Sequence, residues 1–77
     1  MIKILLFAYL QEEIGKDSLS METDGCSVQQ VKNYIHTHYP TTNLDQVMAA
    51  VNEEFSFDED VVKDGDVIAF LPPVSGG

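Results

Sequence analysis

The residues best suited to chemistry are two glycines, Gly76 and Gly77, which follow Pro72-Pro73. Prolines cannot donate to a β-ladder, so we expect the chain to leave its last strand there and extend outwards as a flexible tail. Glycines lack a Cβ and can pass through a slot where any side chain would clash. A carboxylate on Gly77 resists nucleophiles, but adenylation by ATP on a partner enzyme would activate it. A sulfur nucleophile could then displace AMP and leave a thiocarboxylate able to deliver sulfur.

The histidines and the cysteine could bind metals or react, but their number and spacing favour structural roles. His36 and His38 are two positions apart on a predicted helix, so they point in nearly opposite directions and cannot chelate one metal ion. Cys26 is the only cysteine, which excludes an internal disulfide and a cysteine-ligated zinc or iron–sulfur site within one chain. We expect Cys26 to be a small apolar filler and the protein to bind no metal or cofactor.

Carboxylates gather in the last third of the sequence without the spacing of a calcium loop. We expect them to form a solvated acidic surface that steers the protein towards basic partners. The sequence contains neither a Ser–His–Asp constellation nor a phosphate-binding loop. The catalytic groups are therefore expected on partner enzymes. The carboxylates are Glu53, Glu54, Asp58, Glu59, Asp60, Asp64 and Asp66.

Length and net charge limit the classes of protein to which this chain can belong. A chain of 77 residues can form one small domain. Its net charge is −9, from 13 Asp and Glu against 4 Lys, which excludes most nucleic-acid binding and docking on an anionic membrane. The longest apolar runs, 4–10 and 67–74, are too short to span a bilayer. The sequence starts directly with a strand-like segment, so we expect a cytosolic protein.

One clear helix is predicted after Ser27. Ser27 and Gln30 have the spacing of a capping box, and Pro40 sets the far limit of the helix. Apolar positions then recur along one stripe, which should face the core. The stripe consists of Val28, Val31, Ile35 and His38.

The strands predict an α+β fold. The most hydrophobic segments are the first and the last, so pairing them in parallel at the centre of a mixed sheet buries the most surface. With the one main helix on one face, this is the ubiquitin-like β-grasp, with a domain over 1–71 and a tail over 72–77. Residues 9–15 are expected to be a connection with room for one helical turn. The predicted strands are 2–8, 17–22, 47–51, 55–57 and 67–71.

A single helix leaves the other face of the sheet uncovered. That face would present Leu5 and Phe7 beside Ala69 and Leu71. An apolar patch on a small protein commonly marks a docking site, so we expect a partner to bind there.

These motifs resemble the small, sulfur-carrying subunits of molybdopterin synthases. The resemblance spans nearly the whole chain, and its most specific part is the ending from Phe70 to Gly77 with its Pro-Pro-Val-Ser lead-in. Further matching residues are 1–10, Glu12, Gly15, Ala50-Val51-Asn52 and Asp64-Gly65-Asp66. The family often has Arg where this sequence has Gln11, so no role of that Arg is carried over.

The resemblance implies two protein partners. The tail would enter the active site of a large catalytic subunit, in a heterotetramer of two small and two large subunits. There the thiocarboxylate of Gly77 would donate sulfur to cyclic pyranopterin monophosphate. An adenylyltransferase similar to ubiquitin-activating enzyme would recharge it with ATP. Partner contacts would fall on Phe7, Phe55, Leu71, Pro72, Pro73, Val74, Ser75 and Gly76.

Three alternatives remain open at the level of sequence. A ubiquitin-like modifier would use the same activated Gly77 to form isopeptide bonds with lysines. A sulfur carrier for thiamin or for transfer-RNA thiolation would share the terminal glycines. A plain interaction domain would carry an inert tail.

Overall fold

The computed structural model describes residues 1–44 and 46–72. The predicted tail residues 73–77 therefore lie outside the described residues. Two helices and seven strands make up the described chain. In order they are β1 (Ile2–Leu6), α1 (Tyr9–Ile14), β2 (Ser18–Met21), β3 (Gly25–Ser27), α2 (Val28–His38), β4 (Met48–Val51), β5 (Glu54–Ser56), β6 (Val61–Lys63) and β7 (Val67–Leu71).

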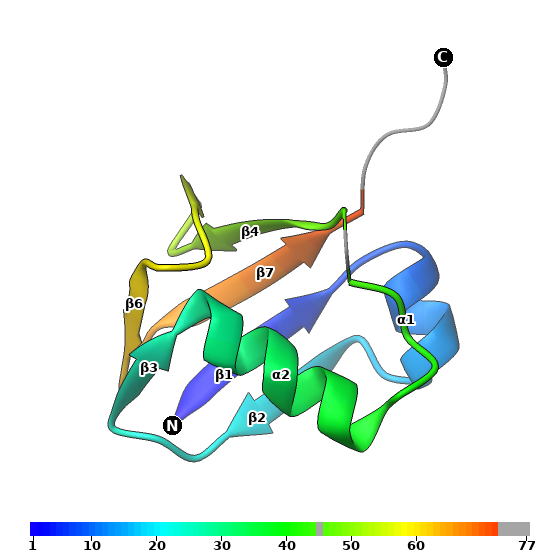
Figure 1. The fold of residues 1–77 in the computed structure, drawn as a ribbon, viewed down its shortest axis with the longest axis horizontal. Coiled ribbons are helices and arrows are strands. Elements are labelled where there is room, and N and C mark those ends of the chain that lie inside the picture. The colour runs from blue at the N-terminus through cyan, green and yellow to red at the C-terminus, as the bar shows by residue number, and fades with distance from the viewer. Residues whose placement is uncertain (45, 73–77) are drawn as a thin grey trace.

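The main sheet has the order β2-β1-β7-β4-β5. Its first and last strands, β1 and β7, run parallel at the centre, with Ile4 opposite Ile68 and Leu6 opposite Phe70. The other neighbouring strands pair antiparallel. Helix α2 crosses one face of this sheet (Figure 1). The prediction of a ubiquitin-like β-grasp with central parallel terminal strands is confirmed.

Helix α2 begins where the capping box predicts. The Gln30 backbone N–H donates to Ser27 Oγ at 3.1 Å, and the Ser27 N–H donates to Gln30 Oε1 at 2.9 Å. The helix ends at His38, ahead of Pro40, and Tyr39 is its C-terminal capping residue. Together these features fix both ends of the element that covers the sheet.

The core lies between α2 and the covered face of the sheet. Alternate residues of β1 and β7 point into it, and all are almost fully buried. They are Ile2, Ile4, Leu6, Ile68 and Phe70. From the predicted stripe of α2, Val28, Val31 and Ile35 are fully buried, but His38 is exposed, so its predicted place on the core stripe is wrong. The His38 ring instead contacts that of Tyr34, with 4.3 Å between the ring centroids.

Two parts of the fold differ from the sequence prediction. Residues predicted as a connection form α1, because Leu10 and Ile14, four positions apart, both reach the core and Gly15 ends the helix at φ 82°. A second, two-stranded sheet pairs β3 with β6, with Cys26 opposite Val62. Neither helix of the described residues is long and apolar enough to cross a membrane.

Candidate functional site

The uncovered face of the sheet carries an apolar surface. In β1 and β7 the residues that alternate with the core positions point away from α2, and Leu5 lies opposite Ala69 in the parallel ladder. Phe55 on β5 lies opposite Ala50 on β4 and extends this face. We call the result the docking surface; its groove has a volume of about 620 Å³. The groove is lined by Leu5, Phe7, Ala50, Asn52, Glu53, Phe55, Val67, Ala69 and Leu71.

Large aromatic side chains are left in solvent on this surface. The exposed fraction is 44% for Phe7 and 73% for Phe55. Leu71 is half-buried at the end of β7. The structure thus brings together Phe7, Phe55 and Leu71, the three sheet-face residues among the eight predicted to contact partners. Their binding role remains a prediction at this point.

The base of the tail adjoins the docking surface. Because β1 and β7 are parallel, their carboxyl ends meet at the same edge of the sheet. Leu6 lies opposite Phe70, so Phe7 and Leu71 follow side by side and Pro72 comes next. A partner seated on the docking surface would therefore contact the chain directly before its tail.

A hydrogen-bonded turn holds the hairpin that carries Phe55. Asn52 and Glu53 have φ values of 51° and 71°, the left-handed region typical of a tight hairpin turn. The Asn52 N–H donates to the Val67 carbonyl at 2.7 Å, and the Val67 N–H donates back to Asn52 Oδ1 at 3.1 Å. These bonds fix the turn against the start of β7.

Asp66 continues this network. Its carboxylate accepts hydrogen bonds from the Lys63 backbone N–H at 2.9 Å and from Asn52 Nδ2 at 3.1 Å. Both hydrogen bonds lower the pKa of Asp66 below its ordinary value of 3.8, and the bond from the Lys63 backbone has the larger effect. At neutral pH Asp66 is therefore charged and ties the β6–β7 turn to the hairpin.

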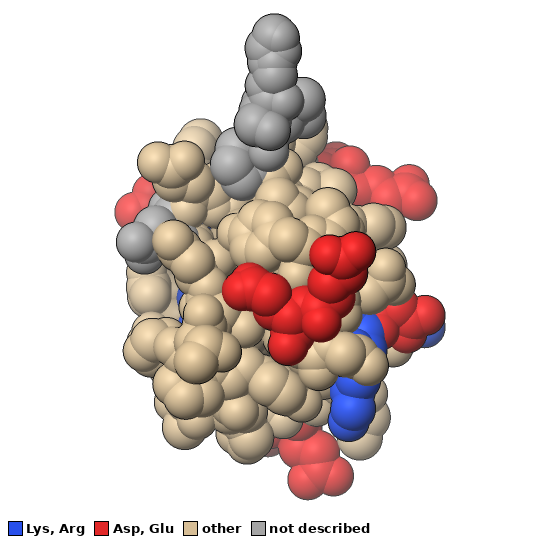
Figure 2. Space-filling model, turned by 90° about the vertical axis from the view of Figure 1, so that its right-hand side faces the viewer, with Lys and Arg blue, Asp and Glu red and all other residues tan. Residues whose placement is uncertain are grey.

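Several of the predicted surface carboxylates hold loops in place. Lys32 Nζ lies 2.6 Å from Asp58 Oδ1, and Asp60 Oδ2 accepts from the Phe57 N–H at 2.7 Å. The N-terminal ammonium pairs with Asp64. Figure 2 shows a further group of Asp and Glu side chains on the side of the molecule where α1 lies. Steering towards basic partners remains a prediction.

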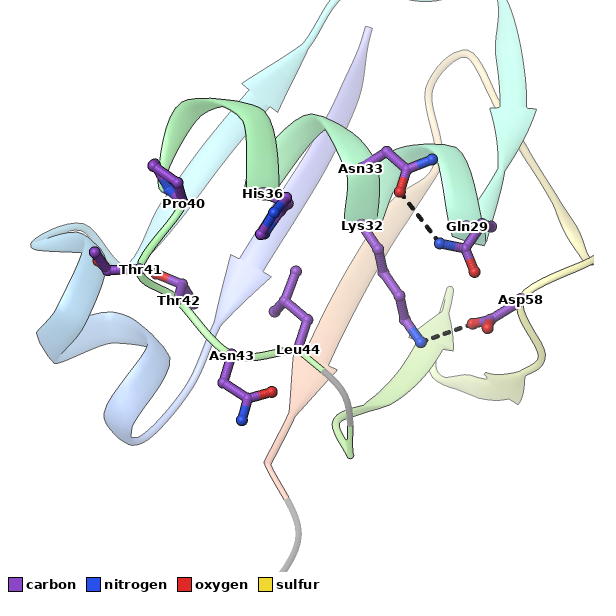
Figure 3. A pocket seen from close by; sticks show the side chains of 10 residues that line it. All are labelled: Gln29, Lys32, Asn33, His36, Pro40, Thr41, Thr42, Asn43, Leu44 and Asp58. Atoms are coloured by element: carbon purple, nitrogen blue, oxygen red, sulfur yellow. Dashed lines mark hydrogen bonds and ion pairs between the residues drawn. The ribbon is translucent and has the colours of Figure 1, made fainter.

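The cysteine and the two histidines form no reactive centre. Cys26 is half-buried, and burial raises the pKa of its thiol, which disfavours the reactive thiolate. His36 is exposed in a polar groove beside α2, together with Lys32 and Asn33 (Figure 3). Within residues 1–44 and 46–72, no group of three or more His, Cys, Asp or Glu is placed to hold a metal ion.

Comparison with known proteins assigns the family. The ThiS family model matches residues 4–77. The chain belongs to the ThiS family. A relative of this ThiS-family chain from Dictyostelium discoideum is named molybdopterin synthase sulfur carrier subunit. It is 40% identical over 82 residues, which cover 97% of this chain and 94% of the relative.

Solved structures share the fold of this ThiS-family chain. The small archaeal modifier protein 1 from Methanosarcina acetivorans has a TM-score of 0.80 and 26% identity, over 99% of this chain and 95% of that one. A chain in the complex of subunits 1 and 2 of the molybdopterin-converting factor from Helicobacter pylori has a TM-score of 0.69. Its identity is 22%, over 99% of this chain and 97% of that one.

Two exposed residues of this ThiS-family chain were missed as surface candidates. Met48, opposite Leu71 in the β4–β7 ladder, is 45% exposed, and Phe57 is 76% exposed. Both line a second groove of about 510 Å³, which also contains Phe55. The alternation of Phe55 and Phe57 in a predicted strand was the signal that could have marked Phe57 as a second exposed aromatic residue.

Proposed function

We propose that this chain is the sulfur carrier subunit of a molybdopterin synthase. The observation that carries the proposal is the match over nearly the full chain to the relative of that name. The docking surface supports it, because an apolar face beside the base of the tail is what a carrier needs to present its terminus to an enzyme. The Pro-Pro-Val-Ser-Gly-Gly ending agrees with the family resemblance.

The chemistry we propose takes place at the carboxylate of Gly77. A carboxylate oxygen attacks the α-phosphorus of ATP on an adenylyltransferase, and pyrophosphate leaves. A sulfur nucleophile at the oxidation level of hydrosulfide then attacks the acyl carbon and AMP leaves, so one carboxylate oxygen is replaced by sulfur. The thiocarboxylate sulfur then attacks a carbon of cyclic pyranopterin monophosphate in the large subunit, and water cleaves the bond between this sulfur and the Gly77 acyl carbon, which restores the carboxylate. ATP is used by the activating enzyme, and this chain itself binds no cofactor.

Binding to the partner falls to the docking surface, and the chemistry falls to the tail. Phe7, Phe55 and Leu71 would contact the large subunit, while Gly76 would let the tail pass into its active site. The Helicobacter pylori complex provides a precedent for a subunit pair built with this fold. We propose a heterotetramer of two small and two large subunits, located in the cytosol.

Sulfur transfer with purified components tests the proposal. A chain lacking Gly76 and Gly77 should still bind the large subunit through the docking surface but transfer no sulfur. Replacement of Phe7 by Ala should weaken binding while leaving the tail chemistry on the adenylyltransferase measurable. Cofactor synthesis that survives deletion of the two glycines would contradict the proposal.

A second candidate function is protein modification through Gly77. The observation in its favour is the similarity to the small archaeal modifier protein 1 of Methanosarcina acetivorans. Such a modifier would be found joined to lysines of other proteins. Mass spectrometry of proteins that carry this chain in cells distinguishes the two, since a sulfur carrier should show a thiocarboxylate and no isopeptide adducts.

A further inference from the structure

Phe57 is an exposed aromatic residue on a tightly held turn. Its N–H donates to Asp60 Oδ2 at 2.7 Å, and the Asp60 N–H donates to the Phe57 carbonyl at 3.0 Å. The next residue is tied to helix α2, because the Asp58 carbonyl accepts from the Gln29 N–H at 2.9 Å and its carboxylate pairs with Lys32 at 2.6 Å. The Lys32 side chain is 16% exposed. Phe57 is the most exposed large apolar side chain within residues 1–44 and 46–72, and the backbone beneath it is therefore fixed before any partner binds.

This rigidity has a consequence for binding. Association loses free energy when loops and side chains must be ordered at the interface. A ring presented on a preorganised turn avoids most of that loss. Aromatic residues, Phe among them, are enriched in the buried cores of protein–protein interfaces.

Phe57 is continuous with the docking surface. Met48 lies opposite Leu71, and it lines the second groove together with Phe57. Phe55 lines both grooves and joins them. The apolar area thus runs from Phe7 across the sheet and around its β5 edge.

Charge indicates what surrounds the ring on a partner. Asp58 and Glu59 follow Phe57 directly, are exposed, and line the same groove. Lys32 in that groove is paired with Asp58, so the net negative charge of the groove is that of Glu59. A complementary partner surface would offer an apolar hollow bordered by Lys or Arg.

We propose that Phe57 is an anchor residue that extends the docking surface around the β5 edge and inserts into an apolar, basic-rimmed hollow of the large subunit. The inference rests on the proposed function, which supplies the partner. It assigns to Phe57 a share of the affinity that Phe7, Phe55 and Leu71 alone would not provide.

The test is the dissociation constant between the full-length chain and its large subunit, measured by titration calorimetry. Phe57→Ala should weaken binding about thirtyfold or more, which corresponds to the loss of about 2 kcal/mol that defines a binding hot spot. Val61→Ala is the matched control, since Val61 is 62% exposed but lines neither groove, and it should leave the constant unchanged. Glu59→Gln should slow association and reduce its salt dependence. Equal melting temperatures for Phe57→Ala and wild type would confirm that the fold is intact.

The outcomes separate this inference from the proposed function. If Phe7→Ala weakens binding but Phe57→Ala does not, Phe57 is no anchor and the proposed function stands. If Val61→Ala weakens binding as much as Phe57→Ala, the effect is not specific to the groove and the inference is wrong. If the wild-type chain does not bind the large subunit, both the proposed function and this inference are wrong.

Discussion

Replacing Glu53 by glycine should stabilise the protein. Glu53 has a φ of 71° in the β4–β5 turn, a conformation that costs an L-residue with a Cβ roughly 1–2 kcal/mol. Glycine removes this strain but loses about 0.5–1 kcal/mol through the larger entropy of its unfolded chain. The substitution would also place an Asn-Gly pair at the centre of the turn, the preferred sequence for this type of hairpin. We expect a net gain of about 0.5–1 kcal/mol in the free energy of unfolding.

Thermal and urea denaturation measure this gain. For a domain of this size it corresponds to a rise of roughly 2–8 °C in melting temperature. Glu53→Gln controls for the removal of one negative charge and should give less than half of the gain, because it keeps the Cβ. Glu54→Gly, on the adjacent strand residue, which is not in the left-handed region, should destabilise the protein. If Glu53→Gly is no more stable than Glu53→Gln, the claim that the backbone is strained at Glu53 is wrong.

Three further predictions concern the capping box, Asp66 and Cys26. Ser27→Ala should lower the free energy of unfolding by about 1 kcal/mol in urea, and Ser27→Gly by only a few tenths, because glycine is tolerated at the N-cap. The lowered folded-state pKa of Asp66 means that its stabilising contribution is present above 3.8 and is lost as pH falls through the folded value. Stability measured against pH should therefore fall less steeply in acid for Asp66→Asn than for wild type; equal slopes would contradict the network. Alkylation of Cys26 by iodoacetamide should be slower than that of a fully exposed cysteine thiol, because burial raises the pKa of Cys26. For the same reason the rate should still be rising at pH 9.0. A plateau below pH 9.0 would show an activated thiolate instead.

The large elements of the fold could be predicted because their signals are local and strong. The capping box places the start of α2 at Val28, and the two most apolar segments become the central strands β1 and β7. The uncovered face could be predicted because one main helix can cover only one of the two faces of a sheet. Its aromatic residues Phe7 and Phe55 lie where the period of two predicts.

The small elements could not be predicted because tertiary contacts define them. Strands β3 and β6 have three residues each, too few to show a period, and are recognisable only through their pairing. Helix α1 has six residues and depends on the burial of Leu10 and Ile14. His38 fits the apolar stripe by spacing, yet it lies in the last turn, where it remains in solvent and contacts Tyr34.

The individual roles of the acidic residues were also beyond what the sequence could predict. Composition predicts a solvated surface, and Glu53, Glu54 and Glu59 are exposed as expected. Asp60 and Asp66 instead cap turns, because a carboxylate next to free backbone N–H groups accepts their hydrogen bonds. These contacts depend on the exact turn conformation, which a sequence pattern does not specify.

The mass of the intact chain from cells tests the central claim most directly. The account predicts that a fraction of the protein has one oxygen replaced by sulfur, that fragmentation places the sulfur on Gly77, and that this fraction falls when the large subunit and its substrate are supplied. A carboxylate left wholly unmodified in cells that retain the adenylyltransferase but lack the large subunit, or a chain found only on lysines of other proteins, would contradict the account.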